Sequence, residues 1–179
     1  MASVLVPLAQ GCEELEAVTI IDLLRRAGID VVSAGLDEKA VIASRGVVLL
    51  PDTDLNSALS REYDMVVLPG GLPGADHLDS DPRIRDLLMM MASKGKYTAA
   101  ICAAPKVLYS TGVLNNKMAT AYPGVLEALG AQSQDEAIVE DDKVITSRGP
   151  GTAMDFALTL IERLVGKEKR DEVENGLVR

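Results

Sequence analysis

Apolar and polar residues alternate along the chain in blocks that predict strands followed by helices. Short, continuous apolar runs are typical of strands buried on both faces, and amphipathic stretches of about 10 to 15 residues separate them. The predicted strands cover residues 3–9, 30–36, 63–71, 97–102, 137–141 and 143–147, with a further β-segment at 41–52. The predicted helices cover residues 13–28, 81–95, 104–114 and 149–166.

Local residue types support these boundaries. Gly28 follows the first amphipathic stretch and is a typical helix stop. Pro82 lies near the first turn of the predicted helix at 81–95, where proline is well tolerated. Residues 115–131 are expected to be looser, and the chain is expected to close in a charged tail after residue 166.

The order of these elements predicts one doubly wound α/β domain over residues 1–179. Buried strands that alternate with helices form a mostly parallel sheet with helices on both faces. No linker, low-complexity tract or convincing repeat interrupts the chain. The tripeptide SRG occurs at 44–46 and again at 147–149, but its surroundings differ.

Composition and charge exclude several classes of function. The net charge of −9 argues against general binding of nucleic acid, and the absence of Trp with a single Phe argues against a base-stacking platform. No apolar run approaches the roughly 18 to 20 residues that span a bilayer. The N-terminus does not resemble a secretory signal, and two cysteines make no disulfide framework. A cytoplasmic protein is therefore expected.

Three predicted loops meet at one edge of the sheet: residues 10–16, 69–76 and 101–105. Ligands of such sheets bind beyond the carboxyl ends of the strands. Cys102 lies where a buried strand meets a helix, a turn that exposes its central side chain. The helix N-terminus is expected to lower the pKa of the thiol. The alternative is that Cys102 is a small buried apolar residue.

The other two loops carry paired glycines and a group of acids. Gly70 and Gly71 can present bare N–H groups to an oxyanion, although they also suit a plain turn. Glu13, Glu14 and Glu16 can simply favour the helix dipole. A carboxyl group in a cleft would instead have a raised pKa and could donate a proton to a thiolate. Glu13 and Glu16 share one helix face, whereas Glu14 points elsewhere.

The sequence lacks the residues that several common catalytic and binding sites require. The only histidine, His77, precedes Cys102 and is interpreted as a surface residue, so no downstream Cys–His dyad is encoded. No Cys/His cluster supports a metal site, and no glycine-rich segment has the spacing of a phosphate or dinucleotide loop. The sequence predicts neither a metal nor a cofactor.

With these loops assembled, the sequence resembles the ThiJ/PfpI superfamily, and most closely the branch of the Parkinson-associated deglycase and bacterial YajL. The most specific segments are AAICAAP (99–105) and SRGPGT (147–152). The resemblance implies a flavodoxin-like fold, a homodimer, a nucleophilic and easily oxidised Cys102, and Glu16 as its carboxyl partner. It also implies that the backbone of Gly70, Gly71 and Ala103 forms an oxyanion pocket. Arg45 and Arg148 would line or brace the site near the dimer interface. A purely structural ion pair is the alternative for each arginine.

Three positions depart from patterns in that superfamily. Tyr122 stands where some members carry a histidine, which removes one route for protons. Ala103 stands where protease-like members have a histidine directly after the nucleophile, so the peptidase function is excluded. The glutamine amidotransferase function is excluded as well, because the sequence has no catalytic histidine. Cys12 stands where relatives generally have a small residue, and a packed bystander is the preferred interpretation over a second reactive thiol.

The leading hypothesis is a cofactor-free enzyme that acts on reactive carbonyls such as methylglyoxal, glyoxal or their adducts with amines and thiols. Cys102 would attack the carbonyl carbon and Glu16 would move protons. The alternative is a non-enzymatic oxidative-stress sensor or redox-regulated chaperone in which Cys102 becomes a sulfinic acid.

Overall fold

A seven-stranded sheet forms the centre of the molecule. The computed structural model describes residues 1–179. The strands are β1 (Ser3–Leu8), β2 (Asp30–Gly35), β5 (Thr53–Asp54), β6 (Met65–Leu68), β7 (Tyr97–Ile101), β8 (Ile138–Asp141) and β9 (Val144–Ser147). Their order is β5-β2-β1-β6-β7-β9-β8, and every neighbouring pair is parallel except β8 with β9. The strands β3 (Val41–Ile42) and β4 (Val48–Leu49) form a separate antiparallel hairpin.

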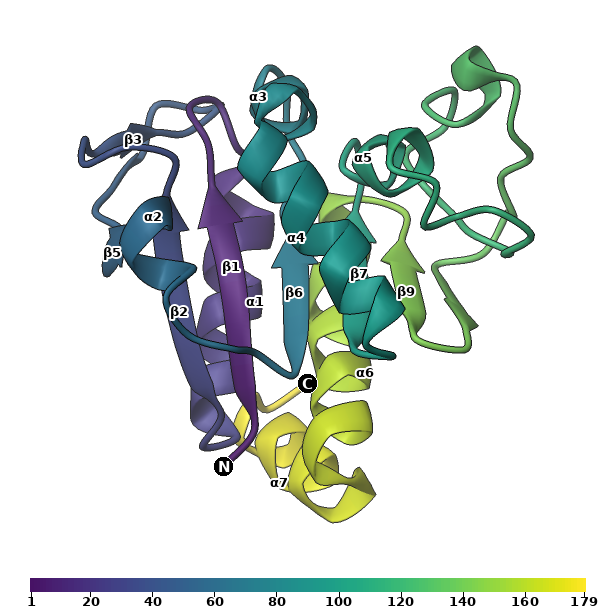
Figure 1. The fold of residues 1–179 in the computed structure, drawn as a ribbon. Coiled ribbons are helices and arrows are strands. Elements are labelled where there is room, and N and C mark those ends of the chain that lie inside the picture. Colours follow the sequence, from purple (N-terminus) through teal and green to yellow (C-terminus); the bar gives the residue numbers. More distant parts are fainter.

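Helices cover both faces of this sheet. They are α1 (Glu14–Arg26), α2 (Leu55–Ala58), α3 (Gly74–Ser80), α4 (Pro82–Ser93), α5 (Pro105–Ser110), α6 (Ala153–Val165) and α7 (Lys167–Gly176), with 3₁₀ turns at Glu127–Leu129 and Pro150–Thr152. In Figure 1, α1 and α6 lie behind the sheet, and α2 and α4 lie in front of it. The flavodoxin-like, mostly parallel α/β fold predicted from the sequence is confirmed.

Two apolar cores result from this layering. Successive strand residues point to opposite faces, so Val4 and Val6 of β1 join the core under α1 and α6, while Leu5 joins the core under α2 and α4. All three side chains are fully buried. Burial on both faces explains why β1 is a continuous apolar run rather than an alternating one.

The structure differs from the sequence prediction at several helices. The loop at 69–76 leads into α3, which was not predicted. The helix expected at 104–114 is regular only over Pro105–Ser110, and the one expected at 149–166 begins with a 3₁₀ turn. No helix is both long and apolar enough to cross a bilayer.

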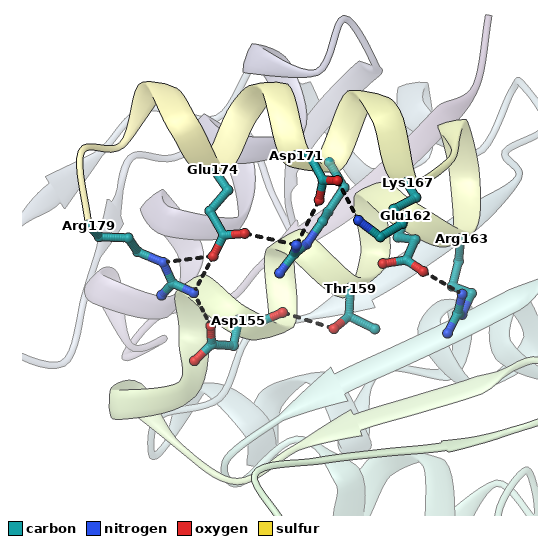
Figure 2. A network of polar contacts seen from close by, with 9 residues as sticks. Asp155, Thr159, Glu162, Arg163, Lys167, Asp171, Glu174 and Arg179 are labelled. Atoms are coloured by element: carbon teal, nitrogen blue, oxygen red, sulfur yellow. Dashed lines mark hydrogen bonds and ion pairs between the residues drawn. The ribbon is translucent and has the colours of Figure 1, made fainter.

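The expected charged tail is instead the helix α7, which packs on α6. Figure 2 shows the ion pairs in this region: Arg179, just beyond α7, contacts Asp155 of α6 and Glu174 of α7, and Lys167 contacts Asp171 within α7. Each such exposed pair contributes at most about 1 kcal/mol. Val173, which is 5% exposed, anchors the helix to the core. This helix was not predicted because a single apolar residue among charges gives almost no amphipathic pattern.

Candidate functional site

Cys102 occupies a strained turn between β7 and α5. Its φ of 64° lies in the left-handed region, which costs a non-glycine residue on the order of 1 kcal/mol or more. Two hydrogen bonds hold the turn: the Cys102 N–H donates to the Ser147 carbonyl at 2.9 Å, and the Tyr122 N–H donates to the Cys102 carbonyl at 2.8 Å. These bonds fix the thiol at the carboxyl edge of the sheet.

The loop after β6 approaches this turn as closely as a backbone can. A Cβ atom placed on Gly70 would lie 2.7 Å from the Cys102 Cβ and 2.8 Å from Glu16 Oε2. A Cβ on Gly71, whose φ is 88°, would lie 2.4 Å from the Glu13 nitrogen. Only glycine fits at either position, so the paired glycines predicted from the sequence serve close approach as well as turning.

Glu16 lies beneath the thiol and is completely buried. Its Oε2 accepts the Gly70 N–H at 2.8 Å. Its Oε1 has no hydrogen-bond partner, and the carboxyl group lies close enough to the Cys102 thiol for each group to shift the pKa of the other. The Glu16 N–H donates to the Glu13 side chain at 2.8 Å, which caps α1 and sets the position of the acid.

Burial raises the pKa of Glu16 from 4.5 to about 7. The hydrogen bonds from Gly70 and Cys102 oppose this rise, and the charge of Glu13 adds to it. The direction is the one expected for a carboxyl group enclosed in a cleft. Near neutral pH, Glu16 can therefore both hold and release a proton.

The expected lowering of the Cys102 pKa is wrong. Burial raises the pKa of this thiol to about 12, and the charge and hydrogen bond of Glu16 raise it further than the N–H groups of Gly71 and Ala103 can lower it. A helix N-terminus favours a thiolate, but here the desolvation of a side chain that is only 8% exposed outweighs that effect. The helix itself is only six residues long.

The thiol and the carboxyl group are best treated as one titrating pair. When Glu16 is ionised, its charge opposes a thiolate nearby. When the proton resides on Glu16, that opposition disappears, and the Gly71 and Ala103 N–H groups favour the thiolate. Between about pH 7 and 12 the pair therefore holds one proton, which resides mainly on sulfur, and the form with a thiolate and a protonated Glu16 is the minor one.

The expected oxyanion donors have unequal roles. The Gly70 N–H is already donated to Glu16, so it is not free to bind an oxyanion. The N–H groups of Gly71 and Ala103 instead face the Cys102 sulfur. Two of the three predicted donors are thus close enough to lower the pKa of the thiol, and their role toward an oxyanion stays a prediction.

The two arginines lie outside this cluster. Arg148 forms an ion pair with Asp135, and its backbone N–H donates to the Ala137 carbonyl at 3.0 Å. Arg45 is exposed, and its backbone N–H donates to Glu14 at 2.8 Å. No hydrogen bond or ion pair joins either guanidinium to Cys102 or Glu16.

The three remaining notable residues have distinct surroundings. His77 is exposed on α3. Tyr122 is 51% exposed and its ring packs over Gly149, beside the Cys102 turn. Cys12 is 1% exposed and free, and burial with the charges of Glu14 and Glu13 raises its pKa to about 12. The role of Glu14 was missed, because its hydrogen bonds to residues 44–47 leave no trace in local sequence.

Comparison with known proteins places the chain in a family. A model described as the DJ-1/PfpI family matches residues 2–163. The chain belongs to the DJ-1/PfpI family. This result confirms the resemblance seen in the sequence.

DJ-1 proteins from several organisms are similar over nearly the whole chain. Drosophila melanogaster protein dj-1beta is 48% identical over 180 residues, covering 98% of this chain and 96% of that protein. Its crystal structure has a TM-score of 0.95 and covers 99% of this chain and 97% of the other. Toxoplasma gondii DJ-1, described as oxidized, is 38% identical with the same TM-score and covers 99% and 98%. The glutathione-independent glyoxalase DJR-1.2 of Caenorhabditis elegans is 34% identical over 174 residues, covering 96% and 92%.

Proposed function

We propose that the protein is a cysteine-dependent, cofactor-free enzyme that converts reactive carbonyls, such as methylglyoxal and glyoxal or their early amine and thiol adducts, into hydroxy acids. The observation that carries the proposal is the fully buried Glu16 carboxyl group, with a pKa of about 7, which lies with Cys102 against the same side of Gly70. Such a pair can deliver a thiolate and a proton at the same place. The glyoxalase described from Caenorhabditis elegans, at 34% identity, supports the same reaction class.

The first step forms a bond between sulfur and carbon. The Cys102 thiolate attacks the aldehyde carbon of methylglyoxal, and the carbonyl electron pair moves to oxygen. The Gly71 and Ala103 N–H groups, which face the sulfur, stabilise the negative charge as it passes to the adjacent oxygen. Glu16 then gives its proton to that oxygen, which completes a hemithioacetal.

The second step moves hydrogen between neighbouring carbons. The Glu16 carboxylate removes the proton from the former aldehyde carbon, and the resulting enediol is reprotonated on the neighbouring carbon. One carbon is oxidised and the other reduced, so the product is a thioester of lactate and no external oxidant is needed. Water then breaks the carbon–sulfur bond, releasing lactate and restoring the thiol. Glyoxal gives glycolate by the same steps.

The test is formation of lactate from methylglyoxal without glutathione. Proton NMR should show lactate appearing in proportion to the protein concentration, and the activity should disappear after Cys102 is alkylated. Methylglyoxal that disappears without an equivalent amount of lactate would contradict the reaction, because simple adduct formation consumes the aldehyde as well. The free thiols suit a reducing, cytoplasmic setting.

A second candidate function, an oxidative-stress sensor or redox-regulated chaperone, uses the same pocket. The unpartnered Glu16 Oε1 and the two N–H groups that face the sulfur could bind the oxygens of a sulfinic acid. Each oxygen would come from one peroxide molecule, with water released. The description of Toxoplasma gondii DJ-1 as oxidized supports testing this possibility.

Mild peroxide separates the two functions. A sensor should gain a stable two-oxygen adduct at Cys102 under conditions that leave the exposed Met118 unmodified, as read by intact-mass and peptide mass spectrometry. Fast lactate formation by the reduced protein, with no preference of peroxide for Cys102, would contradict the sensor. Cys12→Ser should not change the adduct, because Cys12 is buried in the core.

We further propose that the protein self-associates through an apolar face beside the site. Leu15 and Val18 lie on one side of α1 and are 51% and 47% exposed, and Val48 of the β3–β4 hairpin is 63% exposed. The neighbouring Ile42 and Val47 are exposed as well. Exposed apolar side chains gathered in this way are typical of a protein interface.

Val48→Asp is expected to convert the dimer into a monomer. An uncompensated charge in an apolar interface should weaken association on the order of 100-fold. Sedimentation velocity at low micromolar concentration measures the change. Met118→Asp is the control, since Met118 is similarly exposed, at 57%, in the 115–121 segment away from the β3–β4 hairpin. Unchanged sedimentation of Val48→Asp would contradict this interface.

A further inference from the structure

Glu14 is a buried acid that the reaction above does not use. Its side chain is 9% exposed. Because Glu14 precedes Glu16 by two residues, the two side chains project from different sides of α1. Its carboxylate accepts three hydrogen bonds from one short turn: from the Ser44 hydroxyl at 3.0 Å, the Arg45 N–H at 2.8 Å and the Val47 N–H at 3.5 Å. The N-terminal turn of α1 thus holds the 44–47 turn directly.

This carboxylate is stabilised by hydrogen bonds alone. No lysine or arginine pairs with Glu14 in any ion pair of the structure. Burial acts to raise its pKa, but hydrogen bonds from its own backbone, Ser44, Arg45 and Val47 outweigh burial and lower it. Glu14 is therefore an acceptor at neutral pH, and apart from its own backbone N–H its donors all belong to the 44–47 turn.

The 44–47 turn has few other attachments. The Ser44 N–H donates to the Cys12 carbonyl at 2.8 Å, and the Ala43 N–H donates to the Val47 carbonyl at 2.9 Å, which closes the turn on itself. Arg45 lies at its tip, exposed and without an ion pair, so its backbone bond to Glu14 sets where the guanidinium can reach. Val47 begins the part of the hairpin that carries the apolar face.

We propose that Glu14 is a positioning residue that couples self-association to the Cys102 site by fixing the 44–47 turn against the helix that bears Glu16. The carboxylate places Arg45, whose cation can bind the carboxylate of the hydroxy acid and the negative oxygens that precede it. It also places Val47 in the apolar face. This inference rests on the proposed function, while its effect on association can be measured without any catalysis.

The test compares Glu14→Ala with Glu14→Gln. Alanine removes all three acceptor bonds, and we expect KM for methylglyoxal to rise about tenfold with kcat nearly unchanged, and the dimer to dissociate more readily by a similar factor. Glutamine can still accept both N–H groups and can donate to the Ser44 hydroxyl, so it should rescue both values. Asp54→Ala is the matched control, because Asp54 caps the short helix α2 at the far edge of the sheet.

A double-mutant cycle with Arg45→Ala decides between positioning and general destabilisation. If Glu14 acts through Arg45, adding Glu14→Ala to Arg45→Ala should raise KM no further. Additive effects on KM, failure of Glu14→Gln to rescue, or an equal effect from Asp54→Ala would each overturn the proposal. Should the wild type make no lactate, the proposed reaction fails, and the dissociation constants of the same variants still test the role of Glu14.

Discussion

Cys102→Ser is expected to reduce lactate formation from methylglyoxal by about a thousandfold or more, because an alcohol is a far weaker nucleophile than a thiolate and a worse leaving group from the ester that follows. The side chain is nearly isosteric, and the hydrogen bonds that fix the turn come from the backbone. The fold should therefore remain intact. Initial rates measured by proton NMR, at equal concentrations of folded protein, give the comparison.

Cys12→Ser is the matched control for this loss. Cys12 is the only other cysteine and is buried in the apolar core. Its replacement should lower stability and leave the rate within about twofold of the wild type, since no step uses it. If Cys102→Ser turned over as fast as the wild type, the covalent mechanism would be refuted. If only Cys12→Ser lost activity, Cys12 and not Cys102 would be the nucleophile.

Glu16→Gln is expected to remove a large pH dependence of stability. The pKa of Glu16 rises from 4.5 to about 7 on folding, so the folded protein binds more protons than the unfolded chain between these values. The wild type should therefore lose about 3 kcal/mol of its free energy of unfolding as the pH rises from about 4.5 to 7. Glutamine has no proton to lose, and its oxygen can still accept the Gly70 N–H.

Urea unfolding of both proteins at a series of pH values measures this difference. The curves should agree near pH 4.5, and Glu16→Gln should become the more stable protein above pH 7. Glu38→Gln, which replaces an exposed acid, should retain the pH dependence of the wild type. The same fall in stability in Glu16→Gln and in the wild type would show that another group titrates.

The same variant separates the acidity of the thiol from proton transfer. Without the charge of Glu16, the pKa of Cys102 should fall, so iodoacetamide should alkylate Cys102 faster at neutral pH. Lactate formation should nevertheless slow, because glutamine cannot carry the proton between carbon and oxygen. An increase in both rates would indicate that Glu16 only suppresses the thiolate.

The strands of the sheet were predicted from the sequence more accurately than the helices that pack on its two faces. The continuous apolar runs of β1, β6 and β7 identify buried parallel strands, since only those are enclosed on both faces. The helix α3 was not predicted because its seven residues directly follow the segment PGGLP (69–73), which indicates a turn. The helix α7 was not predicted because Val173 is its only large apolar residue, so its sequence has almost no amphipathic pattern.

At the site, the residue types could be predicted from the sequence, but the pKa values of their groups could not. The cysteine turn, the glycine pair and the acid at the start of α1 meet as expected, and enclosure raises the pKa of Glu16 as one hypothesis required. The acidity of Cys102 was misjudged because it depends on how much water reaches the sulfur. The bond from Gly70 to Glu16 was likewise invisible, because 54 residues separate its partners.

The close approach of Gly70 to both Cys102 and Glu16 limits how this pocket can diversify. Its inner wall is peptide backbone, and any side chain added there would collide with the reacting pair. Exposed side chains near the reacting pair are the better place to alter substrate preference: Tyr122, whose N–H donates to the Cys102 carbonyl, and Leu72, which follows Gly71, are both more than half exposed. Protein engineers seeking larger carbonyl substrates should randomise those two positions and leave the glycines untouched.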